Sequence, residues 1–352
     1  MAVAEDECSA SDVAGVENGP SGNNSTHKVE IVRIPTIEKH PNADQLGIVN
    51  LWGGYPVIVQ LGEFQEGDLA AYVPPDSILP DTPDWAFLKG HRRIRAKRLR
   101  GIISVGLMVR APAGALEGED VAEQLGIAHY EPKLKGSGSS GMKLGGEDAP
   151  APPGFYPTYD MESLRRYTDV FLPGEEVIVT CKLHGTSYRL AISDGEMFIG
   201  SHKRWKKCDQ DNLWNRVITP EMRDLVRVLP SKSCLYGEVF GGTPAIQKGF
   251  SYGLPEPAFA LFDVWTKGQW LCYDEQVALA AEFNVPTVPL LFRGSFDLDT
   301  ILSLAEGPSI APGADHIREG CVVRPPAERY DRRCGRVVLK AVGMGYWEIN
   351  GR

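Results

Sequence analysis

The stretch Val179-Thr180-Cys181-Lys182-Leu183-His184-Gly185-Thr186-Ser187 decides how this chain is interpreted. Apolar residues at 177, 179 and 181 alternate with the residues between them, which is the period of a β-strand. Lys182 therefore stands at a strand end, directly before a glycine that lets the backbone turn close to a ligand. A neutral amine aimed into a cleft there is a good nucleophile toward an electrophilic phosphate. A lysine at a strand end is, however, more often a solvated cation.

Further short segments with chemical content follow in order. They are Ser201–Arg204, Leu235–Gly241, Phe259–Val264, Arg318–Arg324 and Val337–Lys340. This ordered set resembles the nucleotidyltransferase motifs of the covalent lysyl-nucleotide superfamily, which comprises DNA ligases, RNA ligases and mRNA capping enzymes. The K-x-H-G-T form of the first motif, in place of K-x-D-G, resembles the RNA ligase branch. The resemblance spans about residues 156–352, and five ordered matches are far more specific than one.

The resemblance implies a role for each motif. Lys182 would carry a covalent AMP, and Lys340 would contact the α-phosphate. Glu238 would bind the nucleotide ribose or a water of the metal, and Glu319 would belong to a divalent metal site for Mg²⁺ or Mn²⁺. A carboxylate paired with a neighbouring arginine is the structural alternative for both glutamates. We predict Lys182, Glu238, Glu319 and Lys340 as the catalytic set, with the two glutamates at the metal.

The remaining implied contacts concern the nucleotide. Phe262 would stack on the purine, although most strand phenylalanines are core residues. Arg204 would contact the ribose or the 5′-phosphate of the nucleic acid, and His184, Gly185 and Thr186 would lie at the nucleotide. The last motif departs from the family's usual K-x-K, because Val338 replaces the first lysine.

Length and composition are typical of a two-domain globular protein. The chain has 352 residues, 43% of them hydrophobic, and no apolar run long enough for a membrane span. The beginning of the chain lacks a signal-peptide pattern. Its seven cysteines have no C-x-x-C spacing, so we expect reduced thiols, no zinc and a cytoplasmic location.

The charge is distributed unevenly along the chain. Of the net charge of −9, residues 1–27 supply five acidic side chains and no Lys or Arg, which predicts a disordered acidic tail. A basic run lies further on and consists of Arg92, Arg93, Arg95, Lys97, Arg98 and Arg100. We predict that this run contacts phosphates of a nucleic acid, the alternative being a solvated cationic face.

Residues 28–130 read as about five short strands, which suggests a small closed barrel. The segment His40–Leu46 resembles the entry of OB-fold RNA-binding modules. A β domain that only packs on its neighbour is the alternative. Residues 131–155 are rich in Gly, Ser and Pro and are predicted to be a linker without a packed element. Helices are predicted at 161–167, 214–228 and 273–283.

The predicted fold class is therefore α+β. An N-terminal OB-like β-barrel precedes a nucleotidyltransferase (ATP-grasp-like ligase) domain of antiparallel sheets with flanking helices, over residues 156–352. DNA ligases and capping enzymes carry their OB domain after the last motif, whereas only twelve residues follow Lys340 here. The OB-first order resembles the bacterial RNA ligase family first typified in Deinococcus.

We therefore expect a monomeric ATP-dependent RNA ligase. It would join 3′-OH and 5′-phosphate ends of nicked or broken RNA, or of an RNA/DNA hybrid duplex. A capping-type guanylyltransferase and a non-catalytic RNA-binding protein with a decayed nucleotidyltransferase domain are the alternatives. Retention of Lys182, Glu238, Glu319 and Lys340 argues against decay, and the loss at Val338 argues for it.

Overall fold

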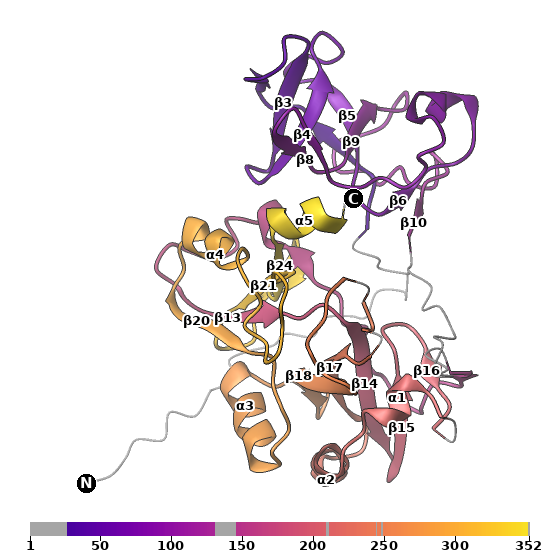
Figure 1. Ribbon diagram of the computed structural model, residues 1–352, viewed down its shortest axis with the longest axis vertical. Coiled ribbons are helices and arrows are strands. Elements are labelled where there is room, and N and C mark those ends of the chain that lie inside the picture. The colour runs from indigo at the N-terminus through magenta and orange to yellow at the C-terminus, as the bar shows by residue number, and fades with distance from the viewer. Residues whose placement is uncertain (1–26, 131–145, 209–210, 244, 248, 351–352) are drawn as a thin grey trace.

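The computed structural model describes residues 27–130, 146–208, 211–243, 245–247 and 249–350. Most of the predicted acidic tail and the Gly/Ser part of the predicted linker lie outside these ranges. The described residues form a β-rich module at the top of Figure 1 and a larger mixed module below it. This is the α+β arrangement that the sequence predicts. No helix among the described residues is both long enough and apolar enough to cross a membrane.

The first module is built from short strands around two apolar clusters. Its elements are β1 (Glu30–Arg33), β2 (Ile37–Lys39), β3 (Leu46–Leu51), β4 (Tyr55–Gln60), β5 (Leu69–Val73), β6 (Ser77–Ile78), the 3₁₀ helix η1 (Pro83–Leu88), β7 (Lys97–Leu99), β8 (Ile102–Ser104), β9 (Leu107–Arg110) and β10 (Ala128–His129). The strands pair antiparallel in the orders β1-β5-β9, β2-β3-β4, β10-β6 and β7-β8. Burial alternates along β3, because one face of this strand packs inward and the other is more exposed to water.

The second module holds the remaining elements. They are β11 (Asp148–Ala149), β12 (Glu162–Ser163), η2 (Leu164–Arg166), β13 (Glu176–Lys182), β14 (Thr186–Ser193), β15 (Glu196–Gly200), β16 (Trp205–Lys206), α1 (Leu213–Arg216), α2 (Pro220–Val228), β17 (Ser233–Gly241), β18 (Pro257–Thr266), β19 (Gln269–Trp270), α3 (Tyr273–Glu282), β20 (Leu290–Ser295), α4 (Leu298–Leu304), β21 (Gly320–Arg324), β22 (Tyr330–Asp331), β23 (Gly335–Arg336), β24 (Leu339–Val342) and α5 (Met344–Asn350).

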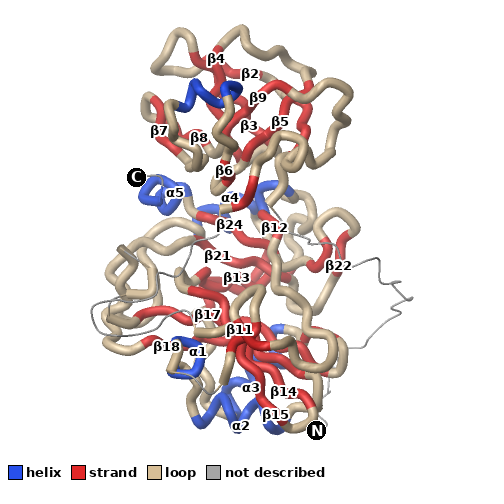
Figure 2. Tube along the Cα trace, turned by 90° about the vertical axis from the view of Figure 1, so that its right-hand side faces the viewer, coloured by secondary structure: helices blue, strands red, loops and turns tan. Residues whose placement is uncertain are grey.

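Two large sheets organise this module. One has the order β11-β16-β15-β14-β17-β18-β19, and the other has the order β12-β24-β21-β13-β20. All their pairings are antiparallel except β12 with β24. β13 and β14 are consecutive in the chain but belong to different sheets, so the turn after Lys182 carries the chain from one sheet to the other. Figure 2 shows both sheets stacked below the first module.

Three local predictions differ from the structure. The predicted helix at 161–167 is wrong: strand β12 and the 3₁₀ helix η2 occupy it, because Glu162 and Ser163 pair in parallel with β24. The helix predicted at 214–228 is split into α1 and α2, since Pro220 begins a new helix capped by Thr219. The predicted linker contains β11, which pairs with β16.

The two modules contact one another through α5 and η2. Figure 1 shows α5 in yellow between the first module and β24. Met344 and Trp347 of α5 pack against the apolar core of the first module. Glu348 accepts two hydrogen bonds from Arg98, at 2.9 and 2.7 Å. Arg166 of η2 forms an ion pair with Glu30 of β1.

Candidate active site

Lys182 is the last residue of β13 and lies opposite Gly320, the first residue of β21. This register brings Glu319 next to the lysine, and the Lys182 Nζ lies 2.7 Å from the Glu319 Oε1. Both side chains are largely buried, with 21% and 13% of their surfaces exposed. The structure thus joins two of the sequence-predicted residues in one ion pair at a strand end.

His184 and Tyr346 extend this pair into a chain of polar contacts. The His184 Nδ1 lies 3.2 Å from the second carboxylate oxygen of Glu319. The Tyr346 hydroxyl, on α5, lies 2.9 Å from the same ring nitrogen. Sequence reasoning missed Tyr346, because no local pattern links α5 to a turn 162 residues earlier.

The turn after Lys182 requires glycine for space. A Cβ atom on Gly185 would stand 2.1 Å from the Val239 carbonyl oxygen and 3.1 Å from the Glu238 side chain. The turn is also held by side chains, since the His184 amide donates to the Tyr252 hydroxyl and Gln247 donates to the Gly185 carbonyl. Glu238 therefore lies against this turn. Thr186, at the start of β14, pairs with Val239 beside it.

Electrostatics at the site are dominated by burial and by three neighbouring charges. Burial lowers the pKa of Lys182, but Glu319 and Glu238 outweigh it and raise that pKa above its usual value. Burial raises the pKa of Glu319, but Lys182 and His184 outweigh it and hold it at about 2. Burial, aided by Glu319 and opposed by Lys182, raises the pKa of Glu238 to about 8. Lys182 is therefore protonated in this state.

A pocket begins at Lys182 and extends between the two sheets. It is lined by Tyr159, Met161, Thr180, Cys181, Lys182, Leu183, Glu238, Phe262, Tyr273, Gln276, Val288, Val322, Arg324 and Val338. The predicted stacking residue Phe262 lies in this wall, partly exposed to the pocket. The wall is mostly apolar with a few polar groups, which is typical of a small-molecule site.

A second, larger hollow, also lined by Lys182, lies between the two modules. Glu319 and Lys340 line it from the second module, and Arg93 and Arg95 line it from the first. We call this hollow the intermodule cleft. Lys182 lines both spaces, so its amine stands where the apolar pocket meets a cleft rich in cations.

Lys340 and Val338 face different surroundings on either side of Leu339. Lys340 lines the intermodule cleft, whereas Val338 is 3% exposed and lines the apolar pocket. Burial and the charge of Lys182 lower the pKa of Lys340. The valine that replaces the family's first lysine thus adds to the apolar wall of the pocket.

Arg204 does not join this site. Its side chain is 69% exposed and forms a 3.0 Å ion pair with Asp148. It lines neither the pocket nor the cleft. Its predicted contact with ribose or RNA stays a prediction.

The basic run of the first module is divided among several surroundings. Arg93 pairs with Asp76 and lies over the Tyr130 ring, while Arg95 is exposed to the intermodule cleft. Arg98 is bound to Glu348 of α5. The other members, Arg92, Lys97 and Arg100, are exposed. The predicted contact of this run with nucleic-acid phosphates stays a prediction.

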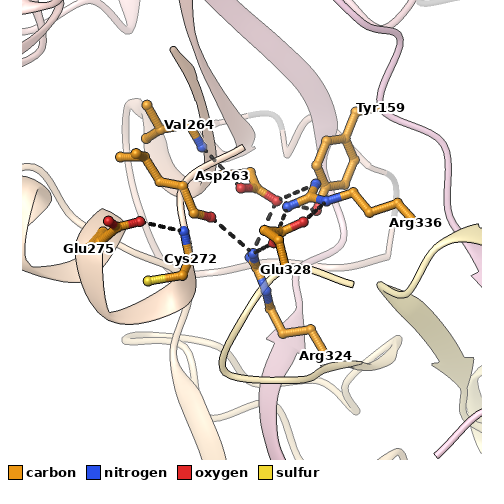
Figure 3. A network of polar contacts seen from close by, with 9 residues as sticks. Tyr159, Asp263, Val264, Cys272, Glu275, Arg324, Glu328 and Arg336 are labelled. Atoms are coloured by element: carbon orange, nitrogen blue, oxygen red, sulfur yellow. Dashed lines mark hydrogen bonds and ion pairs between the residues drawn. The ribbon is translucent and has the colours of Figure 1, made fainter. Parts of the chain in front are cut away.

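A buried polar network lies at the far end of the pocket (Figure 3). Asp263 is fully buried, and its Oδ2 accepts a hydrogen bond of 2.8 Å from the Tyr159 hydroxyl. The same oxygen forms ion pairs with Arg336 at 2.7 Å and with Arg324 at 3.3 Å. Glu328 pairs with both arginines. Two carboxylates thus balance two guanidinium groups, which is how buried charges are tolerated. Sequence reasoning placed Asp263 and Arg324 inside motifs but gave no role to Asp263.

The acidic side chains of the site bear on whether it can hold a metal ion. Among the described residues, no group of three or more His, Cys, Asp or Glu side chains could hold a metal ion by itself. Glu238 and Glu319 nevertheless offer carboxylate oxygens near Lys182, and both interact electrostatically with its amine. A hard divalent cation that keeps waters and substrate oxygens as further ligands fits this donor set.

Comparisons with known proteins agree with this geometry. Residues 175–342 match a family model described as RNA ligase, and residues 28–111 match one described as an OB-fold domain. The segment that matches the RNA ligase model contains Lys182, Glu238, Glu319 and Lys340. A search of curated proteins finds no significant match.

Solved structures of Naegleria gruberi RNA ligase resemble nearly the whole chain. A variant with AMP and Mn has a TM-score of 0.80 at 25% identity and covers 92% of this chain and 100% of its own. A second variant with AMP and Mn has a TM-score of 0.79 at 25% identity, covering 93% and 100%. A variant with ATP and Mn has a TM-score of 0.78 at 24% identity, covering 92% and 99%.

Proposed function

We propose that this chain is an ATP-dependent RNA ligase that works through a covalent AMP on Lys182. One observation carries the proposal: Lys182 stands at the junction of an apolar pocket and a cationic cleft, in contact with Glu319. ATP placed with its base beside Phe262 would bring its α-phosphate to Lys182. Its β- and γ-phosphates would extend into the intermodule cleft.

In the first step the Lys182 Nζ attacks the α-phosphorus of ATP. A P–N bond forms, the bond between the α-phosphorus and the bridging oxygen breaks, and pyrophosphate leaves. The lysine must first lose its proton, which Glu319 and Glu238 oppose in the state described here. Mg²⁺ or Mn²⁺ held by these two carboxylates would supply positive charge that lowers the lysine pKa and stabilises phosphate oxygens.

The later steps use the same amine as a leaving group. A 5′-phosphate oxygen of RNA attacks the phosphorus of lysyl-AMP, and the P–N bond breaks. A 3′-hydroxyl then attacks the adenylylated 5′-phosphate, a phosphodiester forms, and AMP leaves. Lys340 faces the cleft next to Lys182 and would hold phosphate charge during these displacements.

We propose the following division of the chain. Residues 28–130 form an OB-like nucleic-acid-binding domain, 131–155 a linker and 156–352 the nucleotidyltransferase domain. We also propose that the enzyme is a cytoplasmic monomer of the Deinococcus type, which seals nicks in duplex RNA or in RNA/DNA hybrids. Arg95, which is exposed in the intermodule cleft, supports contact of the first domain with the phosphates of a bound strand.

Labelling with nucleotide tests the proposal. The protein is incubated with α-³²P-labelled ATP or GTP and Mg²⁺ and then run on a denaturing gel. We expect a labelled band with ATP, no band for Lys182→Ala, and full labelling of the control Lys39→Ala, an exposed lysine of β2. Labelling with GTP alone would support a capping-type guanylyltransferase. No label with either nucleotide would support the non-catalytic alternative.

Sealing by the same variant separates the steps. Lys182→Ala should still join a chemically pre-adenylylated 5′ end to a 3′-hydroxyl, because that step needs no lysine nucleophile. Failure of both reactions in a variant with an unchanged melting temperature would assign Lys182 a role in the last step as well, contrary to this mechanism.

A further inference from the structure

Gln276 is a buried amide in the wall of the apolar pocket. It lies in the first half of α3, and only 3% of its surface is exposed. Its Oε1 has no hydrogen-bond partner among the described residues. The same side chain lines the pocket that holds Lys182 at its opening and Phe262 in its wall.

An unpaired acceptor in such a place is unusual. Buried polar atoms in folded proteins are nearly always hydrogen-bonded, and leaving one unpaired costs free energy. The pocket wall also holds Thr180, Lys182 and Arg324, which carry donors, but none of them donates a hydrogen bond to the Gln276 Oε1. A ligand that enters the pocket with a donor of its own would satisfy this oxygen.

The missing partner is a hydrogen-bond donor on a flat ligand. Phe262 offers a ring for stacking in the same wall, and Lys182 marks the end at which the phosphates must lie. At the edge of the base, adenine carries an amino group with two N–H donors, whereas guanine carries a carbonyl oxygen at the corresponding atom. Glutamine pairs with adenine through this amino group, and the amide supplies a donor for the neighbouring ring nitrogen.

We propose that Gln276 is the specificity-determining residue that selects ATP by accepting a hydrogen bond from the 6-amino group of adenine. The inference rests on the proposed function, since it assumes that the pocket holds the nucleotide base. A site built around a buried acceptor rejects a ligand that lacks the matching donor, because the acceptor is then left unpaired. Guanine would place an oxygen against the oxygen of Gln276.

The test compares nucleotides in the first step, using the full chain. The rate of lysyl-nucleotide formation is measured with ATP, with purine riboside triphosphate, which lacks only the 6-amino group, and with GTP. We expect the wild type to prefer ATP over the purine analogue by at least about tenfold in the ratio of rate to half-saturating concentration.

Three variants then locate the preference. Gln276→Met keeps the length of the side chain and removes the acceptor, so it should react with ATP and the purine analogue almost equally. Gln276→Glu keeps an acceptor and should retain a preference for ATP. Gln269→Met, an exposed glutamine of β19, is the matched control and should behave as wild type.

The outcomes separate this inference from the function on which it rests. If wild-type protein forms no lysyl-AMP, the proposed function fails. If wild type is labelled but does not distinguish ATP from the purine analogue, Gln276 does not read the amino group. The inference is also overturned if Gln276→Met folds and keeps the full preference. Should Gln276→Met fail to fold, the wild-type ratio and Gln276→Glu still decide.

Discussion

Replacing Asp263 with Asn should destabilise the catalytic module strongly. Asp263 is fully buried, and its Oδ2 receives the Tyr159 hydroxyl and the guanidinium groups of Arg324 and Arg336 (Figure 3). Asn keeps the size of the side chain but removes its charge. Glu328 would then remain as the only carboxylate against two arginines, with a net positive charge held away from water.

The size of the effect follows from that uncompensated charge. Breaking a buried ion pair by removing one partner costs about 3–5 kcal/mol. For a module of this size each kcal/mol lowers the melting temperature by about 2–4 °C, so we expect a decrease of roughly 6–20 °C. Because Tyr159 and Arg324 also line the pocket, the half-saturating ATP concentration should rise in the same variant.

Thermal unfolding followed by tryptophan fluorescence measures this change. Trp270 lies 4.1 Å from the Arg336 guanidinium and reports on the network directly. The control is Asp211→Asn, which removes an exposed partner of Arg216 and should leave the melting temperature nearly unchanged. Equal melting temperatures for the two variants would refute the reasoning, because the buried charges would then contribute no more than a surface pair.

Three further predictions concern the site itself. Tyr346→Phe removes the hydroxyl next to His184 and should lower the maximal rate of lysyl-AMP formation roughly tenfold, with little change in the half-saturating ATP concentration. The control Tyr330→Phe, at an exposed tyrosine, should leave this rate unchanged. A change in ATP affinity alone would show that Tyr346 acts in ATP binding and not in positioning. The pKa of Glu238 is raised to about 8 in the fold, so its stabilising contribution is complete below about pH 4.5 and is lost as the pH rises through 8. Metal-free wild type should therefore lose at least about 1 kcal/mol of unfolding free energy between about pH 5 and 8 relative to Glu238→Gln, as measured by urea titration, and parallel pH profiles would contradict this. Gly185→Ala should abolish labelling and lower the free energy of unfolding by about 1–3 kcal/mol in the same titration, because the new Cβ would stand 2.1 Å from the Val239 carbonyl oxygen. Normal labelling of this variant would show that the turn relaxes to accept the Cβ.

Parts of the site that depend on local pattern could be predicted from the sequence. Alternation along 177–182 places Lys182 at the end of β13, where the structure has it. Asp194 and Gly195, a dipeptide typical of hairpin turns, connect β14 to β15 and have positive φ angles of 50° and 82°. The ordered motifs also selected Glu319 and Phe262, which the structure brings to the ion pair and to the pocket wall.

Parts that depend on distant contacts could not be predicted in this way. The sequence of α5 does not show that Tyr346 contacts His184, and the sequence of α3 does not show that the Gln276 Oε1 lacks a hydrogen-bond partner among the described residues. The helix predicted at 161–167 failed because pairing with β24 outweighs local helical preference. The different surroundings of the basic run were not predictable either, since Arg98 binds Glu348 of α5 while Arg95 lines the cleft.

The position of α5 makes the two modules unsuitable as exchangeable parts. One side of this helix packs against the apolar core of the first module through Met344 and Trp347, while Tyr346 contacts His184, which in turn contacts Glu319, the ion-pair partner of Lys182. An engineer who grafts another RNA-binding module onto this catalytic domain would leave those two apolar side chains without a core. The register of Tyr346 would then depend on the graft. A working chimera therefore requires a new module whose apolar core is designed to accept α5.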